Sequence, residues 1–418
     1  MNKQVFYSAW AEIDLQVIEQ NIKNIQKFIN CKNKLSCKSK LLNNVKTNSK
    51  PKILGVVKAN AYGHGLMQVA NSMIRAGVQY LGTAQVSEAL VLRQNGISSK
   101  DAKILAWLYT PDAPFDEIIA SDIELSVGSI WALEKIAYTV KNNPNLPQKA
   151  KIHLKMDIEF GRDGFSADLY DECFKKVKEY QKYLKVTGLW THFAMADIPE
   201  HPSNKRVLQA YNLFVDKYIE YFGQEDLPIR HIANSAICLT HPELAFDMIR
   251  PGILAYGLKT IDTIDIKKMG FYPAMRLFGK FSSISKYPRG AGVSYGHKYK
   301  PKENTNIAVI PLGYADGLRW VNQNKIQCYS YARKNLIKSV GSVCMDQILF
   351  DLGQNCPEKP GDKVEFFGRG EKPNSLTADD LAKMVGTIGY NVITSIAAKV
   401  PRIYKNEIYK NEKYSKNK

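Results

Sequence analysis

The sequence is poor in cysteine and contains no long apolar run. The seven cysteines are odd in number, and no two of them are spaced as CxxC. We therefore expect neither a disulfide framework nor a zinc site, and the cysteine usage favours the reducing cytosol. No apolar stretch is long enough to span a bilayer, and MNKQVFYSAW at 1–10 lacks the apolar core of a signal peptide. These absences predict a cytoplasmic protein with no metal and no membrane partner.

Acidic residues are also scarce relative to basic ones. The 58 Lys and Arg exceed the 40 Asp and Glu, for a net charge of +18, which can indicate nucleic-acid binding. Residues 31–52 hold seven lysines and no acid, and residues 403–418 add a net three, so these segments hold ten of the eighteen charges. Neither segment interleaves aromatic residues and arginine as a base-reading or phosphate-reading surface would. We interpret them as a lysine-rich insertion at 30–52 and a solvated basic tail, with no nucleic-acid partner.

No GxGxxG motif follows a predicted strand, which disfavours the doubly wound, dinucleotide-binding sheet that is the alternative architecture. Asp14 can cap a first helix, whose apolar residues recur at 15, 18, 22, 25 and 29. Further helical patterns lie at 129–141, 167–182 and 204–221. Eight strands are predicted from ILGVV at 53, YLGTA at 80, KILAWL at 103, IELSVG at 123, KIHLKM at 151, VTGLWTHF at 186, IRHIA at 229 and DMIR at 247.

These β/α alternations over roughly 250 residues predict a (β/α)8, TIM-like barrel at 1–260. The pattern changes after residue 260. LFGKFSSISKY, NIAVIPLGY, LIKSVGSVCMDQILFDLG and DKVEFFG read as strands joined by Gly, Pro and Asn turns. We place a second, mostly β domain at 261–418, which gives an α/β protein of two domains.

Polar residues recur where the predicted barrel strands end, which is where such barrels carry their reactive groups. Lys58 follows the first of these strands, and Arg162 lies in a loop after another. The remaining examples are Lys155, Asp157, His192, Asn234, Ser235 and Arg250.

Lys58 raises the central question of the sequence. A lysine at this place can be structural, with its charged end at the rim of the barrel. Alternatively it is a desolvated amine of lowered pKa, suited to a Schiff base. Tyr62 could lie one turn along the next helix, while NS at 234–235 and PGI at 251–253 offer a hydroxyl and backbone N–H groups to a phosphate. Lysine and phosphate cradle together point to pyridoxal phosphate (PLP).

The chain resembles the alanine racemases, which are fold-type III PLP enzymes, along nearly its whole length. AWAEIDL at 9–15 and VVKANAYGHG at 56–65 match the start of the family and its PLP-lysine motif. HLKMD, THFAMAD, HIANSA, IRPGILAYGL, VSYG, IPLGYADG, GSVCMDQ and KVPRIY follow in the order of the family.

The resemblance implies two catalytic bases. Lys58 would carry PLP and serve one face of the α-carbon, and Tyr295 of the partner subunit would serve the other face. A tyrosine has a pKa near ~10 in water, so it needs positive or donor neighbours to act as a base. The resemblance supplies a chain of Tyr295, His192 and Arg250. Arg250 would face the pyridine nitrogen and, because arginine keeps its proton, would leave that nitrogen unprotonated.

The resemblance also implies how the cofactor and the substrate are held. The cofactor contacts would be Tyr62, His192, Asn234, Ser235, Arg250, Gly252, Ile253 and Tyr390. Arg162 would hold the substrate carboxylate, and the partner's Tyr314 and Met345, beside Asp346, would narrow the entrance. Lys155 matches a lysine that is carbamylated in many members, and the alternative is an ordinary lysine paired with Asp157.

Two segments depart from the family pattern. The usual DTGMGR reads DIEFGR at 157–162, so Glu159 is expected to add negative charge near Arg162. The insertion at 30–52 is longer than the usual link between the first helix and the first barrel strand.

The resemblance leaves other functions open. A PLP-carrier protein would lack the β domain that supplies Tyr295, and a fold-type III decarboxylase would pair the pyridine nitrogen with an acid instead of Arg250. A racemase of another small amino acid such as serine is the nearest alternative. The expected function is a homodimeric alanine racemase that supplies D-alanine for peptidoglycan.

Overall fold

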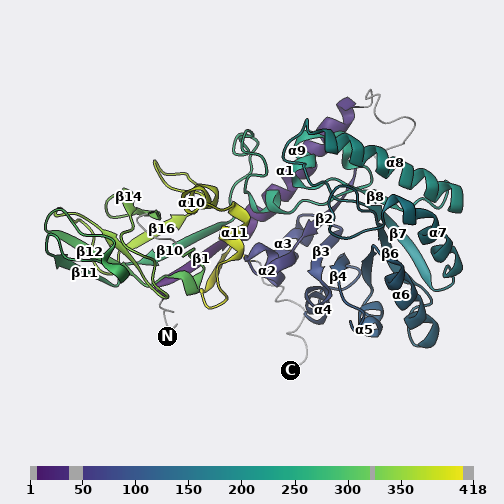
Figure 1. Cartoon of the computed structure of the whole chain (residues 1–418), viewed down its shortest axis with the longest axis horizontal. Helices are drawn as coiled ribbons and strands as arrows, with labels where there is room; N and C mark the ends of the chain where they lie inside the picture. The colour runs from purple at the N-terminus through teal and green to yellow at the C-terminus, as the bar shows by residue number, and fades with distance from the viewer. Residues whose placement is uncertain (1–6, 37–49, 321–324, 408–418) are drawn as a thin grey trace, which may run out of the picture.

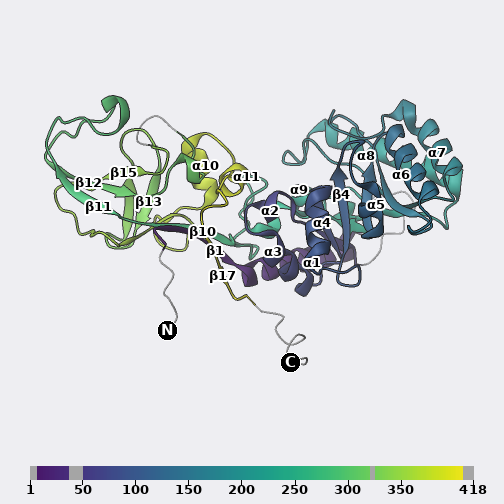
Figure 2. The same cartoon turned by 90° about the horizontal axis from the view of Figure 1, so that it is seen from below.

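The computed structural model describes residues 7–36, 50–320 and 325–407, which form two lobes (Figure 1). The first lobe is a ring of strands surrounded by helices. The second lobe is built mainly from strands, and Figure 2 shows it beside the barrel along the long axis of the molecule. Strand β1 (Ala9–Asp14) and helix α1 (Leu15–Ser36) start the chain and connect the two lobes.

Eight parallel strands form the barrel, and all eight predicted strands are confirmed. Because parallel strands are covered on both faces, their sequences read as apolar runs, and every residue of β5 is buried. The order around the sheet is β8-β7-β6-β5-β4-β3-β2-β9. The strands are β2 (Lys52–Val56), β3 (Tyr80–Gln85), β4 (Lys103–Leu108), β5 (Ile123–Val127), β6 (Ala150–Lys155), β7 (Leu184–Trp190), β8 (Ile229–His231) and β9 (Met248–Ile249).

The ring closes through its shortest strands. β9 pairs with β2 through Lys52 and Ile53. On its other side the Asp247 N–H donates to the Arg230 carbonyl at 3.1 Å, and the Arg250 N–H donates to the Ala233 carbonyl at 2.8 Å. The carboxyl ends of all eight strands therefore meet at one mouth.

The predicted first helix is confirmed, with its cap and its apolar stripe. Asp14 Oδ1 accepts from the N–H groups of Gln16 and Val17, and the stripe from Leu15 to Ile29 is buried. The helix continues to Ser36, so the prediction of irregular chain throughout 30–52 is wrong for its first turns. Residues 37–49 of that predicted insertion lie outside the described residues.

The other helices of the first lobe cover the barrel and include the predicted helices at 129–141, 167–182 and 204–221. They are α2 (Lys58–Tyr62), α3 (Leu66–Arg75), α4 (Val86–Gln94), α5 (Phe115–Ala120), α6 (Ile130–Asn142), α7 (Tyr170–Glu179), α8 (Pro202–Phe222) and α9 (Ser235–Thr240), with 3-10 turns η1 (Ala167–Leu169), η2 (Pro242–Ala245) and η3 (Ile253–Tyr256).

The second lobe contains two sheets, in the orders β14-β13-β16-β10-β1-β17 and β11-β12-β15. Its strands are β10 (Met275–Lys280), β11 (Ser283–Tyr287), β12 (Thr305–Ile310), β13 (Gln327–Ser330), β14 (Asn335–Lys338), β15 (Ile348–Asp351), β16 (Lys363–Phe367) and β17 (Arg402–Lys405). The short helical elements are η4 (Tyr295–His297), η5 (Tyr314–Asp316), α10 (Ala378–Val385) and α11 (Gly389–Thr394).

Strand β1 lies inside the sheet of the second lobe although it precedes the barrel in the chain. It pairs antiparallel with β10 and parallel with β17. The proposed domains at 1–260 and 261–418 therefore share a strand, and residues 9–14 pack with the C-terminal part of the chain.

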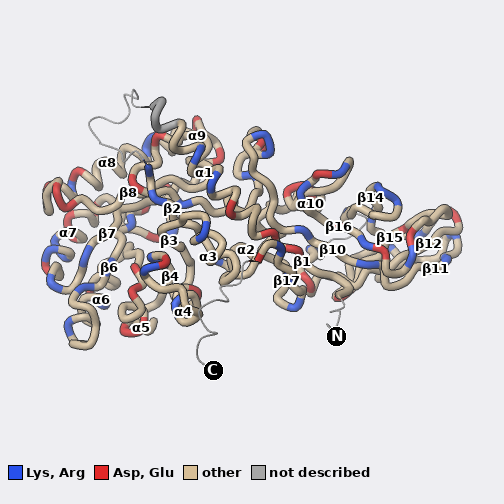
Figure 3. Tube along the Cα trace, turned by 180° about the vertical axis from the view of Figure 1, so that it is seen from behind, with Lys and Arg blue, Asp and Glu red and all other residues tan. Residues whose placement is uncertain are grey.

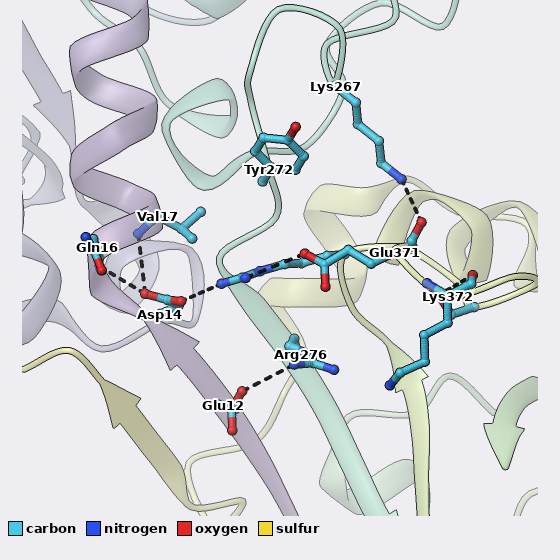
Figure 4. Close-up of polar contacts among 12 residues, drawn as sticks. Glu12, Asp14, Gln16, Val17, Lys267, Tyr272, Arg276, Glu371 and Lys372 are labelled. Carbon is cyan, nitrogen blue, oxygen red and sulfur yellow. Dashed lines mark hydrogen bonds and ion pairs between the residues drawn. The ribbon is translucent and has the colours of Figure 1, made fainter. Parts of the chain in front are cut away.

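The junction between the lobes is polar (Figure 4). Asp14 ends β1 and caps α1, and its carboxylate also binds Arg369, beyond the end of β16, and the side chain of Asn406 at 2.8 Å. Next to it, Glu12 lies 3.6 Å from Arg276 of β10, and Lys267 donates to the Gly370 carbonyl at 3.3 Å. One carboxylate thus orients the strand of one lobe and the helix of the other.

Basic and acidic residues are interspersed along both lobes (Figure 3). In the described part of the chain, no helix has the length and apolar character that a membrane crossing requires, and no cluster of three or more His, Cys, Asp or Glu is arranged to hold a metal ion.

Replacing Asp14 should test the double role of this carboxylate. Asp14→Ala removes both the cap and the ion pair, and we expect it to lower the free energy of unfolding by about 2 kcal/mol. Asp14→Ser keeps a capping oxygen and loses the carboxylate that binds Arg369 and Asn406, so it should lose about half as much. Urea titration followed by circular dichroism measures both values, with Arg369→Ala as the control. Equal losses in the two Asp14 variants would contradict the capping role.

Candidate active site

Lys58 lies at the mouth of the barrel, two residues beyond β2. Its side chain is partly buried, and its Nζ lies 6.0 Å from the centre of the Trp107 ring. Burial lowers the pKa of the amine, and the positive charge of Arg162 lowers it further, while Glu88 acts in the opposite direction. The position therefore favours a neutral, nucleophilic amine.

The turn that follows Lys58 is left-handed. Four consecutive residues, Ala59 to Tyr62, have φ between 52° and 53°. None of them is glycine, and this conformation costs roughly 1–2 kcal/mol per residue for an L-amino acid. The expectation that Tyr62 follows Lys58 along an ordinary helix is therefore wrong in its handedness. The surrounding structure must stabilise the turn, and at its end a Cβ on Gly63 would approach the Ile393 carbonyl oxygen of α11 to 2.3 Å.

Arg250 is buried directly after β9. Because β9 closes the barrel, the Arg250 guanidinium lies at the same mouth as Lys58. Its Nη1 donates to the His231 carbonyl at 2.6 Å and lies 3.1 Å from His231 Nδ1, and its Nη2 donates to the Thr191 carbonyl at 2.9 Å. The Trp190 ring lies under the guanidinium, 4.8 Å from centroid to carbon. Burial lowers the pKa of Arg250 to about 10, so the group remains a cation at neutral pH.

His192 joins this arginine to the other cations of the mouth. Its Nδ1 lies 3.4 Å from Arg250 Nη2. Burial lowers the pKa of His192 well below its usual value, and the charges of Arg250, Arg162, Lys58 and Lys155 lower it further. These residues therefore lie together as the sequence predicted, and His192 is a neutral imidazole among them.

A tight cradle lies beside the end of β2, where the Val56 N–H donates to the Pro251 carbonyl at 3.1 Å. The Ser235 hydroxyl accepts from the Gly252 N–H at 2.9 Å, and the Asn234 side chain caps α9. A Cβ on Gly252 would lie 2.5 Å from the Tyr62 hydroxyl. The Tyr390 ring is 6.2 Å from that of Tyr62. The predicted phosphate contacts, including Ile253 at the start of η3, thus gather around Gly252.

The loop after β6 is organised by Asp157. Its carboxylate accepts from three backbone N–H groups, at 3.3 Å for Gly161, 2.6 Å for Arg162 and 3.1 Å for Asp163. Lys155 is buried and donates to Asp163 at 3.0 Å, so the alternative pairing with Asp157 is wrong. Burial lowers the pKa of Lys155, whereas Asp163 raises it.

Two of the three departures from the family pattern in this loop, Glu159 and Phe160, have separate partners. Glu159 forms an ion pair with Arg206 of α8, which lowers the pKa of its carboxyl group to about 2. Its charge is therefore bound by that arginine instead of acting freely on Arg162. Phe160 packs against the site itself, with the Arg162 guanidinium 4.0 Å from its ring centre and the His192 ring at 5.7 Å.

Tyr295, Tyr314 and Met345 lie on the second lobe and are exposed by 74%, 41% and 55%. Tyr295 belongs to the connection between β11 and β12, strands at the end of the lobe away from the barrel (Figures 1 and 2). Among the described residues, no contact joins these three side chains to Lys58. A single chain therefore does not assemble all of the predicted site.

Both lobes of the chain match models of known protein families. The family described as "Alanine racemase, N-terminal domain" matches residues 38–260, and "Alanine racemase, C-terminal domain" matches residues 274–404. The chain belongs to the alanine racemase family. Members of this family are enzymes, namely PLP-dependent isomerases.

The similarity to individual proteins extends over most of the chain. The alanine racemase of Thermobifida fusca (strain YX) is 37% identical over 354 residues, which cover 84% of this chain and 91% of that protein. A crystal structure of alanine racemase from D-cycloserine-producing Streptomyces lavendulae has a TM-score of 0.85 at 32% identity, covering 97% of this chain and 99% of that one. The alanine racemase of Clostridium difficile 630 has a TM-score of 0.82 at 33% identity, covering 96% and 97%.

Two features of this family member were not predicted from the sequence. Trp190 lies beneath the mouth, against both Arg250 and Lys155. A buried polar group behind Arg250, formed by Glu124, His153 and His231, was also missed. The sequence does contain a signal for this group, because Glu124 interrupts the apolar run IELSV and His153 interrupts the apolar run KIHLK.

The electrostatic setting of Lys58 can be tested with two opposed variants. Arg162→Gln removes a positive charge and should raise the pKa of Lys58, whereas Glu88→Gln removes a negative charge and should lower it. The pH at which Lys58 becomes half-reactive in reductive methylation, followed by mass spectrometry, reports each shift. Shifts of the same sign would contradict this account.

Proposed function

We propose that the chain is a cytoplasmic, homodimeric alanine racemase that binds PLP, interconverts L- and D-alanine with two bases and supplies D-alanine for peptidoglycan. The observation that carries the proposal is the placement of an amine of lowered pKa, a buried arginine and a neutral histidine at one barrel mouth. The specific reaction and the cofactor come from the family to which the chain belongs.

The residues at the mouth fit PLP. Lys58 would hold the cofactor covalently, and the backbone at Gly252 and Ile253 with the Ser235 and Tyr62 hydroxyls would hold its phosphate. Gly252 supports this fit because a Cβ would fill the cradle. PLP, when bound, withdraws electrons from the α-carbon of an amino acid.

Arg250 determines how strong that electron withdrawal becomes. Three carbonyl groups, of Thr191, His231 and Ile232, accept from its two Nη atoms, whereas its Nε makes no hydrogen bond within the described residues. This Nε–H is the group that would donate to the pyridine nitrogen. Because the guanidinium keeps its proton, the ring nitrogen stays unprotonated, and carbanion side reactions are restrained.

Two bases on opposite faces would exchange the α-proton. Lys58 takes or returns it on one face, and the partner subunit supplies Tyr295 for the other. Since His192 Nδ1 accepts from Arg250, its ring proton lies on Nε2, where it can donate to a tyrosine oxygen. The chain of Tyr295, His192 and Arg250 then stabilises the deprotonated tyrosine.

The substrate side of the site is proposed to combine both subunits. Arg162 would bind the carboxylate of alanine, and Tyr314 and Met345 of the second lobe would narrow the entrance from the partner. Lys155 is the proposed carbamylation site, since burial favours the neutral amine whose nitrogen attacks carbon dioxide and releases a proton. Asp163 favours the charged amine and opposes that step.

Chiral analysis of alanine tests the function directly. Purified protein with PLP should convert L-alanine to an equal mixture of enantiomers, and Lys58→Ala should abolish the conversion. Bound PLP without D-alanine would contradict alanine racemisation, and the same assay with serine would then identify the nearest alternative.

Mixing two inactive variants tests the shared site. Lys58→Ala and Tyr295→Phe each retain one of the two bases, so a mixed dimer contains one intact site and one doubly defective site. Random reassociation should recover about a quarter of the wild-type activity. The separate variants provide the control, and failure to recover activity in a verified mixed dimer would place both bases in the same subunit.

Gly252→Ala tests the cradle. Overpacking costs about 1–3 kcal/mol, and about 1.4 kcal/mol is a tenfold change in affinity, so PLP should bind roughly tenfold more weakly or worse. Combining it with Tyr62→Phe removes the clashing hydroxyl, and the double variant should match Tyr62→Phe alone. Fluorescence titration of the apoprotein measures the affinities, and unchanged binding in Gly252→Ala would contradict the phosphate site.

A further inference from the structure

A chain of buried polar groups continues from Arg250 into the interior of the barrel. His231 Nδ1 lies 3.1 Å from Arg250 Nη1. His231 Nε2 lies 2.8 Å from His153 Nδ1, and His153 Nε2 lies 2.6 Å from Glu124 Oε2. The side chains of His231, His153 and Glu124 come from β8, β6 and β5, and each of these three is at most 1% exposed. Four polar side chains therefore form one continuous row behind the mouth.

The donors of this row can be assigned from the arginine alone. A guanidinium only donates, so His231 Nδ1 accepts and the proton of His231 is on Nε2. That proton is donated to His153 Nδ1, which places the proton of His153 on Nε2. The last bond is then donated to the Glu124 carboxylate, which also accepts from Thr187 at 2.9 Å. Both imidazoles are neutral in this arrangement.

The protonation states that the row requires agree with its surroundings. Burial and the positive charge of Arg250 lower the pKa of His231 well below its usual value. Burial alone would raise the pKa of Glu124, but the hydrogen bonds from His153 and Thr187 and the charge of Lys103 lower it.

The strands are built to accommodate this row. His153 lies opposite Gly188 of β7 in the register, and a Cβ on Gly188 would lie 2.1 Å from His153 Nδ1. Trp190 stacks on His231 with centroids 5.5 Å apart and an angle of 9° between the planes. The ring planes, and therefore the directions of the hydrogen bonds, are fixed by packing.

We propose that Glu124 and His153 are positioning residues for racemisation. By accepting the last proton of the row, Glu124 holds His153 and then His231 in single tautomers, which keeps His231 an acceptor for Arg250. The arginine is thereby held as a donor of fixed orientation facing the cofactor ring. This inference rests on the proposed function, and it adds two residues that touch neither cofactor nor substrate.

Neutron diffraction from deuterated crystals of the full protein tests the row without any assay of activity. Deuterium is expected on Nε2 of both His231 and His153 and on neither Nδ1. Deuterium on Nδ1 of either ring would overturn the proposal. If the expected pattern is found in protein that does not racemise alanine, the row stands and the proposed function fails.

Two substitutions of Glu124 test the consequence for the site. Glu124→Leu removes the acceptor and leaves the His153 Nε2–H unpaired. Reversal of both histidines would remove that unpaired donor, but it would set His231 Nδ1–H against the N–H of Arg250. We expect kcat to fall roughly 10- to 100-fold, the loss typical of removing groups that orient a catalytic ligand, and the absorbance maximum of bound PLP to shift. Glu124→Gln places a carbonyl oxygen in the same position and should restore both properties to near the wild-type values.

Asp247→Asn provides the matched control. Asp247 binds Arg230 at 2.8 Å in the same barrel and lies outside the row, so its loss should lower stability without moving the PLP absorbance. A Glu124→Leu protein with the wild-type PLP spectrum and kcat, or a Glu124→Gln protein as impaired as Glu124→Leu, would overturn the positioning role.

Discussion

A buried guanidinium that must satisfy its donors is the constraint on which the barrel mouth depends. Leaving such a charge without partners costs several kcal/mol. Arg250 meets the requirement for its two Nη groups with carbonyl groups at the ends of β7 and β8, while its own backbone N–H closes the sheet onto β8. Arg250 therefore both joins β9 to β8, where the barrel closes, and places its guanidinium at the centre of the candidate site. Lys58, His192 and the Gly252 cradle take their positions around it.

The eight barrel strands could be predicted because each is buried on both faces and reads as an apolar run. The gathering of Lys58, His192 and Arg250 followed from that prediction alone, since parallel strands end at one mouth. The left-handed turn at Ala59–Tyr62 could not be predicted, because the intrinsic preferences of Ala, Asn and Tyr favour right-handed conformations. Glu124 and His153 were missed because a polar residue in an apolar run weakens the strand pattern and identifies no partner. The continuation of α1 to Ser36 was missed because its last residues lack an apolar period.

In the loop at 157–163, the residues that depart from the family pattern lie on a backbone that is held by hydrogen bonds to Asp157. Asp157 holds three backbone N–H groups and so preserves the path of the loop. Within that path, Glu159 turns to Arg206, and Phe160 covers one face of Arg162. The aromatic ring packs against the guanidinium of this arginine, and its plane makes an angle of 74° with that of the His192 ring. The departure from the family pattern therefore places an aromatic ring in the wall of the candidate site, beside Arg162 and His192.

The position of β1 has a consequence for the synthesis of the chain. This strand emerges from the ribosome first, yet its neighbours β10 and β17 are among later residues, and β17 is the last described element. The edge of β1 that pairs with β10 can be satisfied once Met275–Lys280 has been made, but the other edge stays unsatisfied until Arg402–Lys405 has been made. Such an edge invites pairing with foreign strands. The interval before the last residues emerge is thus the period in which this protein most needs protection from aggregation.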